Sequence, residues 1–158
     1  MSMAYRAHLE TCQRHAARLV WAMGQLHRKF PLTASSIKAL SDADLAILDQ
    51  FSTRFAKLQD AMGAKLFSAV LELSKESGNY PAFLDKLNQL EKIGAIASAT
   101  QWLLLREMRN QFAHDYPDDS ELQAAILNKA YALADELLAV LEHIAKFASP
   151  YLTTSSKL

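Results

Sequence analysis

Residues 41–74 read SDADLAILDQFSTRFAKLQDAMGAKLFSAVLELS, and this stretch decides the fold class. Its large apolar residues recur every three or four positions, which is the spacing of one face of an α-helix. Ser41, followed by Asp42 and Asp44, is typical of a helix N-cap with an acidic first turn. We therefore predict one long amphipathic helix with these inward positions: Leu45, Leu48, Phe55, Leu58, Met62, Leu66 and Leu73.

The same spacing predicts four more helices on either side of this stretch. Phe30-Pro31 separates the first helix from the second, because proline disfavours helical geometry in the residue before it. Gly94 is placed to end a short helix, and Ser98 and Ser120 to open the two helices that follow. The expected helices are residues 4–29, 41–74, 83–93, 98–113 and 120–148.

The length and composition favour one helical domain. The chain has 158 residues, about half of them apolar, and only four Gly and four Pro. A chain of this size can bury a sizeable core without a disulfide or a metal, and no stretch alternates as a strand does. We predict an all-α antiparallel bundle of about five helices, a single domain over residues 1–150. Pro150 should end the last helix and leave residues 151–158 as a frayed tail.

Charge and cysteine content limit the possible partners and compartment. Seventeen basic residues balance seventeen acidic ones, so any RNA contact must come from a local patch. The one cysteine, Cys12, excludes an internal disulfide, and its place on the apolar stripe of the first helix indicates a core residue. No secretory core or membrane-length apolar run is present, and the histidines lack metal-ligand spacing. We expect a cytoplasmic protein with neither metal nor cofactor.

The predicted helix 98–113 has two distinct faces. Leu105, Met108 and Phe112 form its core stripe, and a second stripe on the far side collects Leu103, Glu107, Asn110 and His114. Such a face fits a surface that meets a ligand or partner. Helix geometry alone supports equally well a solvated stripe that carries a histidine by chance.

Arg109 lies beside the core stripe, where its plainest interpretation is an ion pair with a carboxylate on a neighbouring helix; we expect Asp60. Arg109 and His114 are five residues apart, or about 140° around a regular helix, so they converge poorly within one helix. Either the helix ends near Ala113 and releases His114, or the site combines residues of two subunits.

Arg109, four residues, His114, one residue and Tyr116 form the pattern R-x4-H-x-Y, with Asn110 directly after the arginine. This pattern resembles the signature of HepT-like proteins of the HEPN superfamily. The segments 54–60 (RFAKLQD), 87–92 (LNQLEK) and 102–110 (WLLLREMRN) are similar to the same family, so the resemblance covers roughly residues 40–147.

The resemblance implies a toxin of a toxin–antitoxin pair, a metal-independent endoribonuclease whose composite active site lies at a homodimer interface. It makes Arg109, Asn110 and His114 catalytic, and makes Tyr116 the acceptor of AMP from a minimal nucleotidyltransferase that neutralises the toxin. We expect five residues to support the site or contact RNA: Arg54, Lys57, Asp60, Arg106 and Glu107.

Two other interpretations stay open. The chain can be a non-enzymatic helical partner that binds a nucleotidyltransferase, since HepT-like proteins have been given both descriptions. It can also be a plain helical oligomerisation domain in which the motif occurs by chance, although the flanking segments disfavour this interpretation.

Overall fold

The computed structural model describes residues 2–112 and 119–156, with side chains up to residue 152. This part of the chain folds entirely into helices and their connections, without a strand, as predicted. None of its helices is both long and apolar enough to cross a membrane. The elements are α1 (Ser2–Leu26), α2 (Ala34–Lys38), α3 (Asp42–Ala61), the π-helical η1 (Met62–Leu66), α4 (Phe67–Leu73), α5 (Phe83–Lys92), α6 (Ala99–Gln111) and α7 (Ser120–Ser156).

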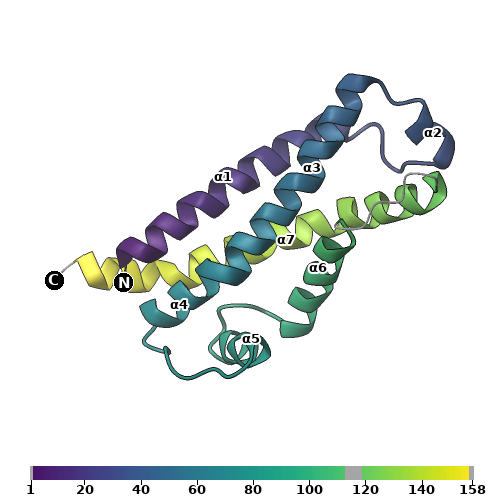
Figure 1. Cartoon of the computed structure of the whole chain (residues 1–158). Coiled ribbons are helices and arrows are strands. Elements are labelled where there is room, and N and C mark those ends of the chain that lie inside the picture. The colour runs from purple at the N-terminus through teal and green to yellow at the C-terminus, as the bar shows by residue number, and fades with distance from the viewer. Residues whose placement is uncertain (1, 113–118, 157–158) are drawn as a thin grey trace.

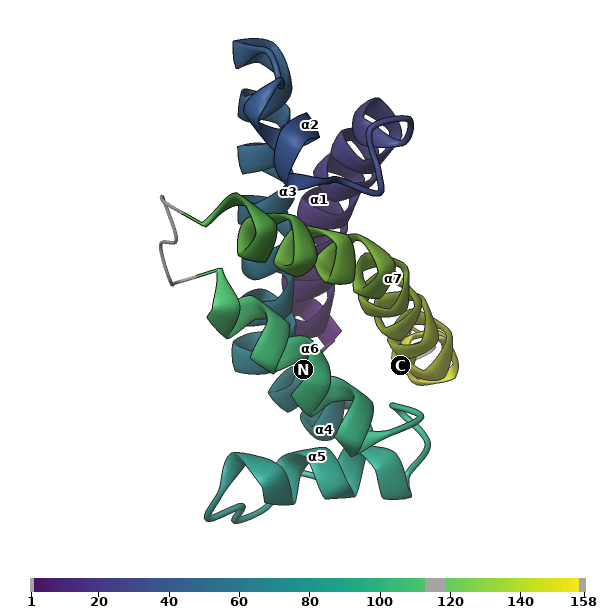
Figure 2. The same cartoon turned by 90° about the vertical axis from the view of Figure 1, so that its right-hand side faces the viewer.

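The long helices set the shape of the molecule. α1 and α3 lie side by side and run in opposite directions, and α7 crosses behind them in the view of Figure 1. α6 packs against both α3 and α7, while α5 covers the end formed by α4 and α6 (Figure 2). With α3, η1 and α4 taken as one continuous helix, the five predicted helices are all present. The short α2 was not predicted.

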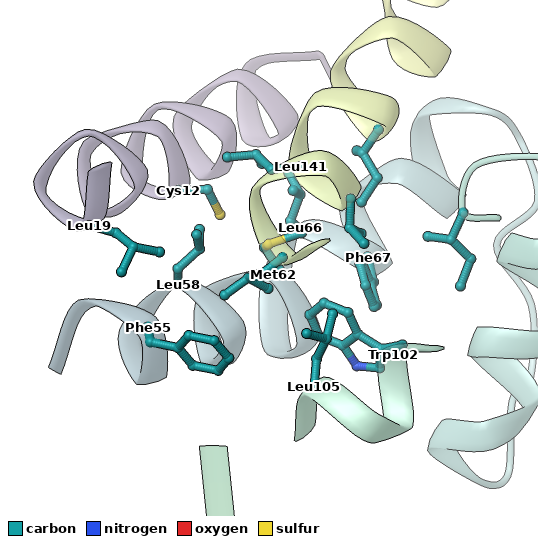
Figure 3. Close-up of a cluster of buried hydrophobic side chains, with 14 of the residues drawn as sticks. Cys12, Leu19, Phe55, Leu58, Met62, Leu66, Phe67, Trp102, Leu105 and Leu141 are labelled. Atoms are coloured by element: carbon teal, nitrogen blue, oxygen red, sulfur yellow. The ribbon is translucent and has the colours of Figure 1, made fainter. Parts of the chain in front are cut away.

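The core lies where α1, α3, η1, α4, α6 and α7 meet, and Figure 3 shows its centre. Cys12 and Leu19 of α1 are fully buried, which confirms the predicted stripe and the core position of the cysteine. Trp102 of α6 is the largest fully buried side chain, and its ring centroid lies 4.5 Å from that of Phe67. Trp102 is thus the main apolar anchor of α6.

The predicted helix 41–74 contains a π-helical turn that apolar spacing does not reveal. In η1 each turn holds more residues than in an α-helix, so the side chains after it are shifted around the axis. Gly63 lies in this turn, and a β-carbon built on it would come within 3.3 Å of Cζ2 of Trp102. The absence of a side chain at Gly63 therefore lets α6 approach closely.

Hydrogen bonds at the helix ends confirm most of the predicted limits. The hydroxyls of Ser41 and Ser98 accept bonds from backbone N–H groups in the first turns of α3 and α6. Gly94 follows α5 with a φ of +85°, a conformation that favours glycine. α7 begins at Ser120, as predicted, but Asp119 rather than Ser120 provides the cap, because its carboxylate accepts the N–H of Leu122 at 2.9 Å.

The predicted end of the last helix is wrong. α7 continues through Pro150 to Ser156, so residues 151–156 are helical and not a frayed tail. Apolar contacts continue past the proline: Ala148 is buried, the ring of Tyr151 lies 5.5 Å from that of Phe147, and Leu152 packs against the core. A proline removes one N–H and strains the preceding turn, and packing on both sides offsets that cost.

Two helical glycines provide a matched test of the close approach at Gly63. Gly63→Val should lower the free energy of unfolding by about 1–3 kcal/mol, because its methyl groups would clash with Trp102. Gly24→Val should change it by less than about 0.5 kcal/mol, because nothing lies within 4 Å of a β-carbon at Gly24. Urea denaturation of both variants measures the difference; equal effects would contradict the packing described.

Candidate active site

The inward face of α6 holds the helix in place. Leu105 and Met108 are buried, and Phe112 is half-buried with its ring edge-on to Phe55 at a centroid distance of 5.4 Å. The predicted core stripe is therefore confirmed. It fixes the rotation of α6 about its axis and so decides which side chains face outward.

The outward face carries Leu103, Glu107 and Asn110, all exposed as predicted. α6 ends at Gln111, with Phe112 as its C-cap. His114, the predicted proton-transfer group, and Tyr116, the predicted AMP acceptor, lie outside the described residues. The described part of the site is thus the last two turns of α6 and what they contact.

Arg109 forms the predicted ion pair with Asp60 of α3. Its Nε donates to Oδ1 at 2.8 Å and its Nη2 to Oδ2 at 2.9 Å, a two-bond arrangement that fixes the plane of the guanidinium. This hydrogen bonding raises the pKa of Arg109 above its usual value. Both side chains remain accessible, with 32% and 49% of their surfaces exposed.

The geometry leaves part of Arg109 available to a ligand. Its Nη1 has no hydrogen-bond partner within residues 2–112 and 119–156 and carries two N–H groups. The carboxylate of Asp60 thus orients the guanidinium while one edge remains able to donate to an anion. Glu107, two residues before Arg109 and on the far side of the helix, makes no ion pair in the same part of the chain.

Of the predicted supporting cations, Arg106 lines a small pocket together with Asp60, the partner of Arg109. Arg106 lies over the ring of Phe83, with its guanidinium carbon 5.5 Å from the ring centroid. Arg54 lies on a different edge of α3 from Asp60, because six residues leave the two side chains about 120° apart around the helix. There its Nη1 is 3.0 Å from Nδ1 of His15 on α1. Lys57 is exposed on the outer surface of α3 between these two edges.

A pocket of about 330 Å³ opens beside the end of α6. Gln111 and Phe112 line it together with Leu45, Ser52 and Ile126 from α3 and α7. Its wall combines apolar side chains with amide and hydroxyl groups. Such a lining can hold a flat, partly polar group such as a nucleobase.

Other kinds of chemistry find little support in the described residues. Burial raises the pKa of the Cys12 thiol to about 12, so this cysteine is not an activated nucleophile. No group of three or more His, Cys, Asp or Glu side chains within this part of the chain is arranged to hold a metal ion.

The sequence interpretation missed one group of residues. The structure places His15 among cations of α1 and α3, a group that the sequence interpretation did not identify. The spacing of Arg14, Arg18 and Trp21 at i, i+4 and i+7 on one helix face was the available signal.

Comparisons of the chain with protein-family models, with curated proteins and with solved structures find no match. The resemblance of residues 54–60, 87–92 and 102–116 to HepT-like proteins therefore stays a prediction from the residues themselves.

A double-mutant cycle of Arg109→Ala and Asp60→Ala measures what the ion pair contributes to stability. We expect a coupling energy of about 0.5–1 kcal/mol, because both side chains are partly exposed and water screens their charges. The more exposed pair Lys146–Glu142 is the control and should couple by about 0.3 kcal/mol. A coupling above about 2 kcal/mol would assign Arg109 to the framework of the fold rather than to a site.

Proposed function

We propose that the chain is a HepT-like, metal-independent endoribonuclease, the toxin of a toxin–antitoxin pair. The observation that supports this best is the position of Arg109 within the R-x4-H-x-Y pattern. It lies on the last turn of α6, oriented by Asp60 and with Nη1 open to an anion. A purely structural ion pair would not require Asn110, His114 and Tyr116 to follow at the spacing of the family.

The chemistry proceeds without a metal. The imidazole of His114, a group suited to proton transfer at neutral pH, accepts the proton of a ribose 2′-hydroxyl. The 2′-oxygen then bonds to phosphorus while the bond to the 5′-oxygen breaks. Arg109 donates to the phosphoryl oxygens as their negative charge increases, and Asn110 orients the imidazole or the phosphate. The products are a 2′,3′-cyclic phosphate and a 5′-hydroxyl end.

A homodimer completes the site in this proposal. Leu103 and Leu104 remain 39% and 57% exposed on the helix that carries the motif, and leucine on such a face is typical of an interface. A two-fold contact through α6 brings two copies of the motif together. The second copy can then return the proton to the leaving 5′-oxygen.

Regulation would act on Tyr116, two residues after His114. AMP groups transferred to its hydroxyl by a minimal nucleotidyltransferase add negative charge and bulk beside the cleft, and both exclude RNA. The transferase forms the bond from the tyrosine oxygen to the α-phosphorus of ATP and releases pyrophosphate. We place this pair of proteins, and the RNA on which the toxin acts, in the cytoplasm.

The bond geometry of Arg109 also favours a second candidate function. Two of its three nitrogens already donate to Asp60, so fewer donors remain than an open phosphate clamp would offer. The alternative is a non-enzymatic partner that presents its outward α6 face to a nucleotidyltransferase. In that case the motif would serve binding rather than cleavage.

Incubation of purified protein with total RNA and a chelator separates the two functions. The wild type should produce fragments with 2′,3′-cyclic phosphate ends, and His114→Ala should lower the cleavage rate by at least about 100-fold, the usual effect of losing a proton-transfer group. Arg109→Lys should also lower it, since lysine cannot reproduce the planar donor geometry. Circular dichroism verifies that each variant keeps its helices.

Cleavage by His114→Ala at the wild-type rate would contradict the assigned role of the histidine. Absence of cleavage by dimeric, unmodified wild type would favour the nucleotidyltransferase-binding module, for which the next measurement is binding to that transferase.

The role of the outward α6 face is tested by Leu103→Glu, with Leu84→Glu on α5 as a control of similar exposure. Two glutamates facing each other across a two-fold contact repel, so sedimentation should show monomers and cleavage should fall with dimer content. Leu84→Glu should leave both unchanged. A Leu103→Glu dimer with full activity would exclude this face as the interface.

A further inference from the structure

A group of positive charges lies along the seam between α1 and α3, on the side of α3 opposite to α6. Its centre is His15, which packs beside Arg54. Burial lowers the pKa of His15, and the nearby positive charges lower it further; these belong to Arg54, Lys57, Arg14 and Arg18.

The bond between Arg54 and His15 defines the charge state of the imidazole. A guanidinium has only donors, so Nη1 of Arg54 donates and Nδ1 of His15 accepts at 3.0 Å. The ring is therefore neutral, with its proton on Nε2. His15 thus adds no fifth charge to its four cationic neighbours at neutral pH.

Within the described residues, no ion pair joins a cation of this group to a carboxylate. The ion pairs there are Lys29–Asp44, Arg109–Asp60 and Lys146–Glu142, none of which includes a cation of the seam. Arg14 and Arg18, four residues apart on α1, repel each other and destabilise the helix slightly. An arrangement that costs stability in the free protein fits a surface that binds a polyanion.

A large exposed aromatic side chain adjoins these charges. Trp21 lies two helical turns after Arg14, about 10 Å along α1, and is 53% exposed. With Arg18 it lines a surface pocket of about 550 Å³ between α1 and α3, whose floor is formed by Ala46 and Ile47. Exposed indole beside arginine is the combination on which unpaired bases stack.

The outer surface of α3 connects this seam to the candidate active site. Arg54, Lys57 and Asp60 follow one another at intervals of three residues, and each step turns about 60° around the helix. The row therefore crosses α3 obliquely, from the contact of Arg54 with His15 to the contact of Asp60 with Arg109. Lys57 lies exposed midway.

We propose that this surface binds single-stranded RNA, with phosphates on its cations and a base on Trp21, and directs the strand across α3 toward Arg109. The choice of RNA over DNA rests on the proposed ribonuclease function, whereas the binding of a single strand rests on the charges and the indole alone. We name it the seam surface; it comprises Arg14, His15, Arg18, Trp21, Arg54 and Lys57.

Single strands fit this surface better than other anions do. A stacking contact requires a base that is not paired in a duplex, and only a flexible chain can follow both the seam and the oblique row on α3. The carboxylates of an acidic peptide would pair with the cations, but they would not stack on the exposed indole of Trp21.

The test measures binding of the full chain to a short, labelled 2′-O-methyl oligouridine by fluorescence anisotropy. This RNA lacks the attacking hydroxyl and cannot be cleaved, so binding is measured independently of His114. The test variant replaces Arg14, Arg18 and Lys57 by Gln, and the matched control replaces the exposed lysines Lys38, Lys92 and Lys129 by Gln. Both remove three positive charges. Arg54 is left intact because its bond to His15 joins α1 to α3.

The seam variant should bind about 100-fold more weakly at about 0.1 M salt. Loss of three phosphate contacts should also reduce the slope of log affinity against log salt by about 2. The control should stay within about threefold of the wild type, because long-range attraction alone is largely screened at this salt concentration. Trp21→Ala should weaken binding about tenfold at every salt concentration, and Trp21→Phe should restore most of it.

Equal losses in the seam and control variants would overturn the proposal, as would a wild type that fails to bind at about 0.1 mM, the weak limit of non-specific binding. Binding to phosphatidylserine vesicles but not to the oligonucleotide would assign the surface to a membrane instead. Binding of the oligonucleotide without cleavage of ordinary RNA would remove the ribonuclease function and leave the seam surface. If the wild type cleaves RNA and the seam variant binds the oligonucleotide as tightly as the wild type, the ribonuclease function would stand and the seam surface would be excluded.

Discussion

The contact between Trp102 and Gly63 is the constraint on which the placement of the candidate site depends. The indole packs against the bare backbone of the π-helical turn and against Phe67, so α6 cannot slide or rotate on α3. Arg109 follows Trp102 by seven residues, two full turns on the same face, and Asp60 precedes Gly63 by three. The two helices run in opposite directions here, so the register fixed at Trp102 brings Arg109 onto Asp60.

Apolar spacing predicted the long helices and most of their inward positions, because both depend on periodicity within one segment. Leu45, expected to face inward, is instead 41% exposed. Apolar spacing did not reveal the π-helical turn. The turn rotates the apolar stripe around the helix axis, but a stripe with helical spacing remains both before and after it in the sequence. The cap of α7 was assigned one residue late because Asp119 and Ser120 are both good caps. α2 depends on a distant residue: the side chain of Asn128 on α7 bonds both the N–H and the C=O of Leu32, which positions the chain before it.

The candidate site was predictable only in part, and for a related reason. Arg109 and Asp60 could be paired because one lies at a core edge and the other is a carboxylate on the adjacent helix. Arg54 and Lys57 were predicted to support the site or contact RNA, yet six residues of helix place Arg54 about 120° around α3 from Asp60, in contact with His15 of α1. Placement around the axis of α3, relative to two different neighbours, cannot be obtained before those neighbours are known.

A net charge of zero conceals a strong separation of charge along the chain. The first forty residues hold six basic side chains and one acidic one, whereas residues 110–158 hold seven acidic and three basic ones. The basic excess is carried by α1 and its connection to α3, and the acidic excess by the segment that surrounds and follows the motif. A polyanion is therefore attracted to the seam and repelled from the start of α7. Under the proposed binding, a strand held at the seam would therefore approach Arg109 across α3, with its phosphates away from Asp119 and Glu121.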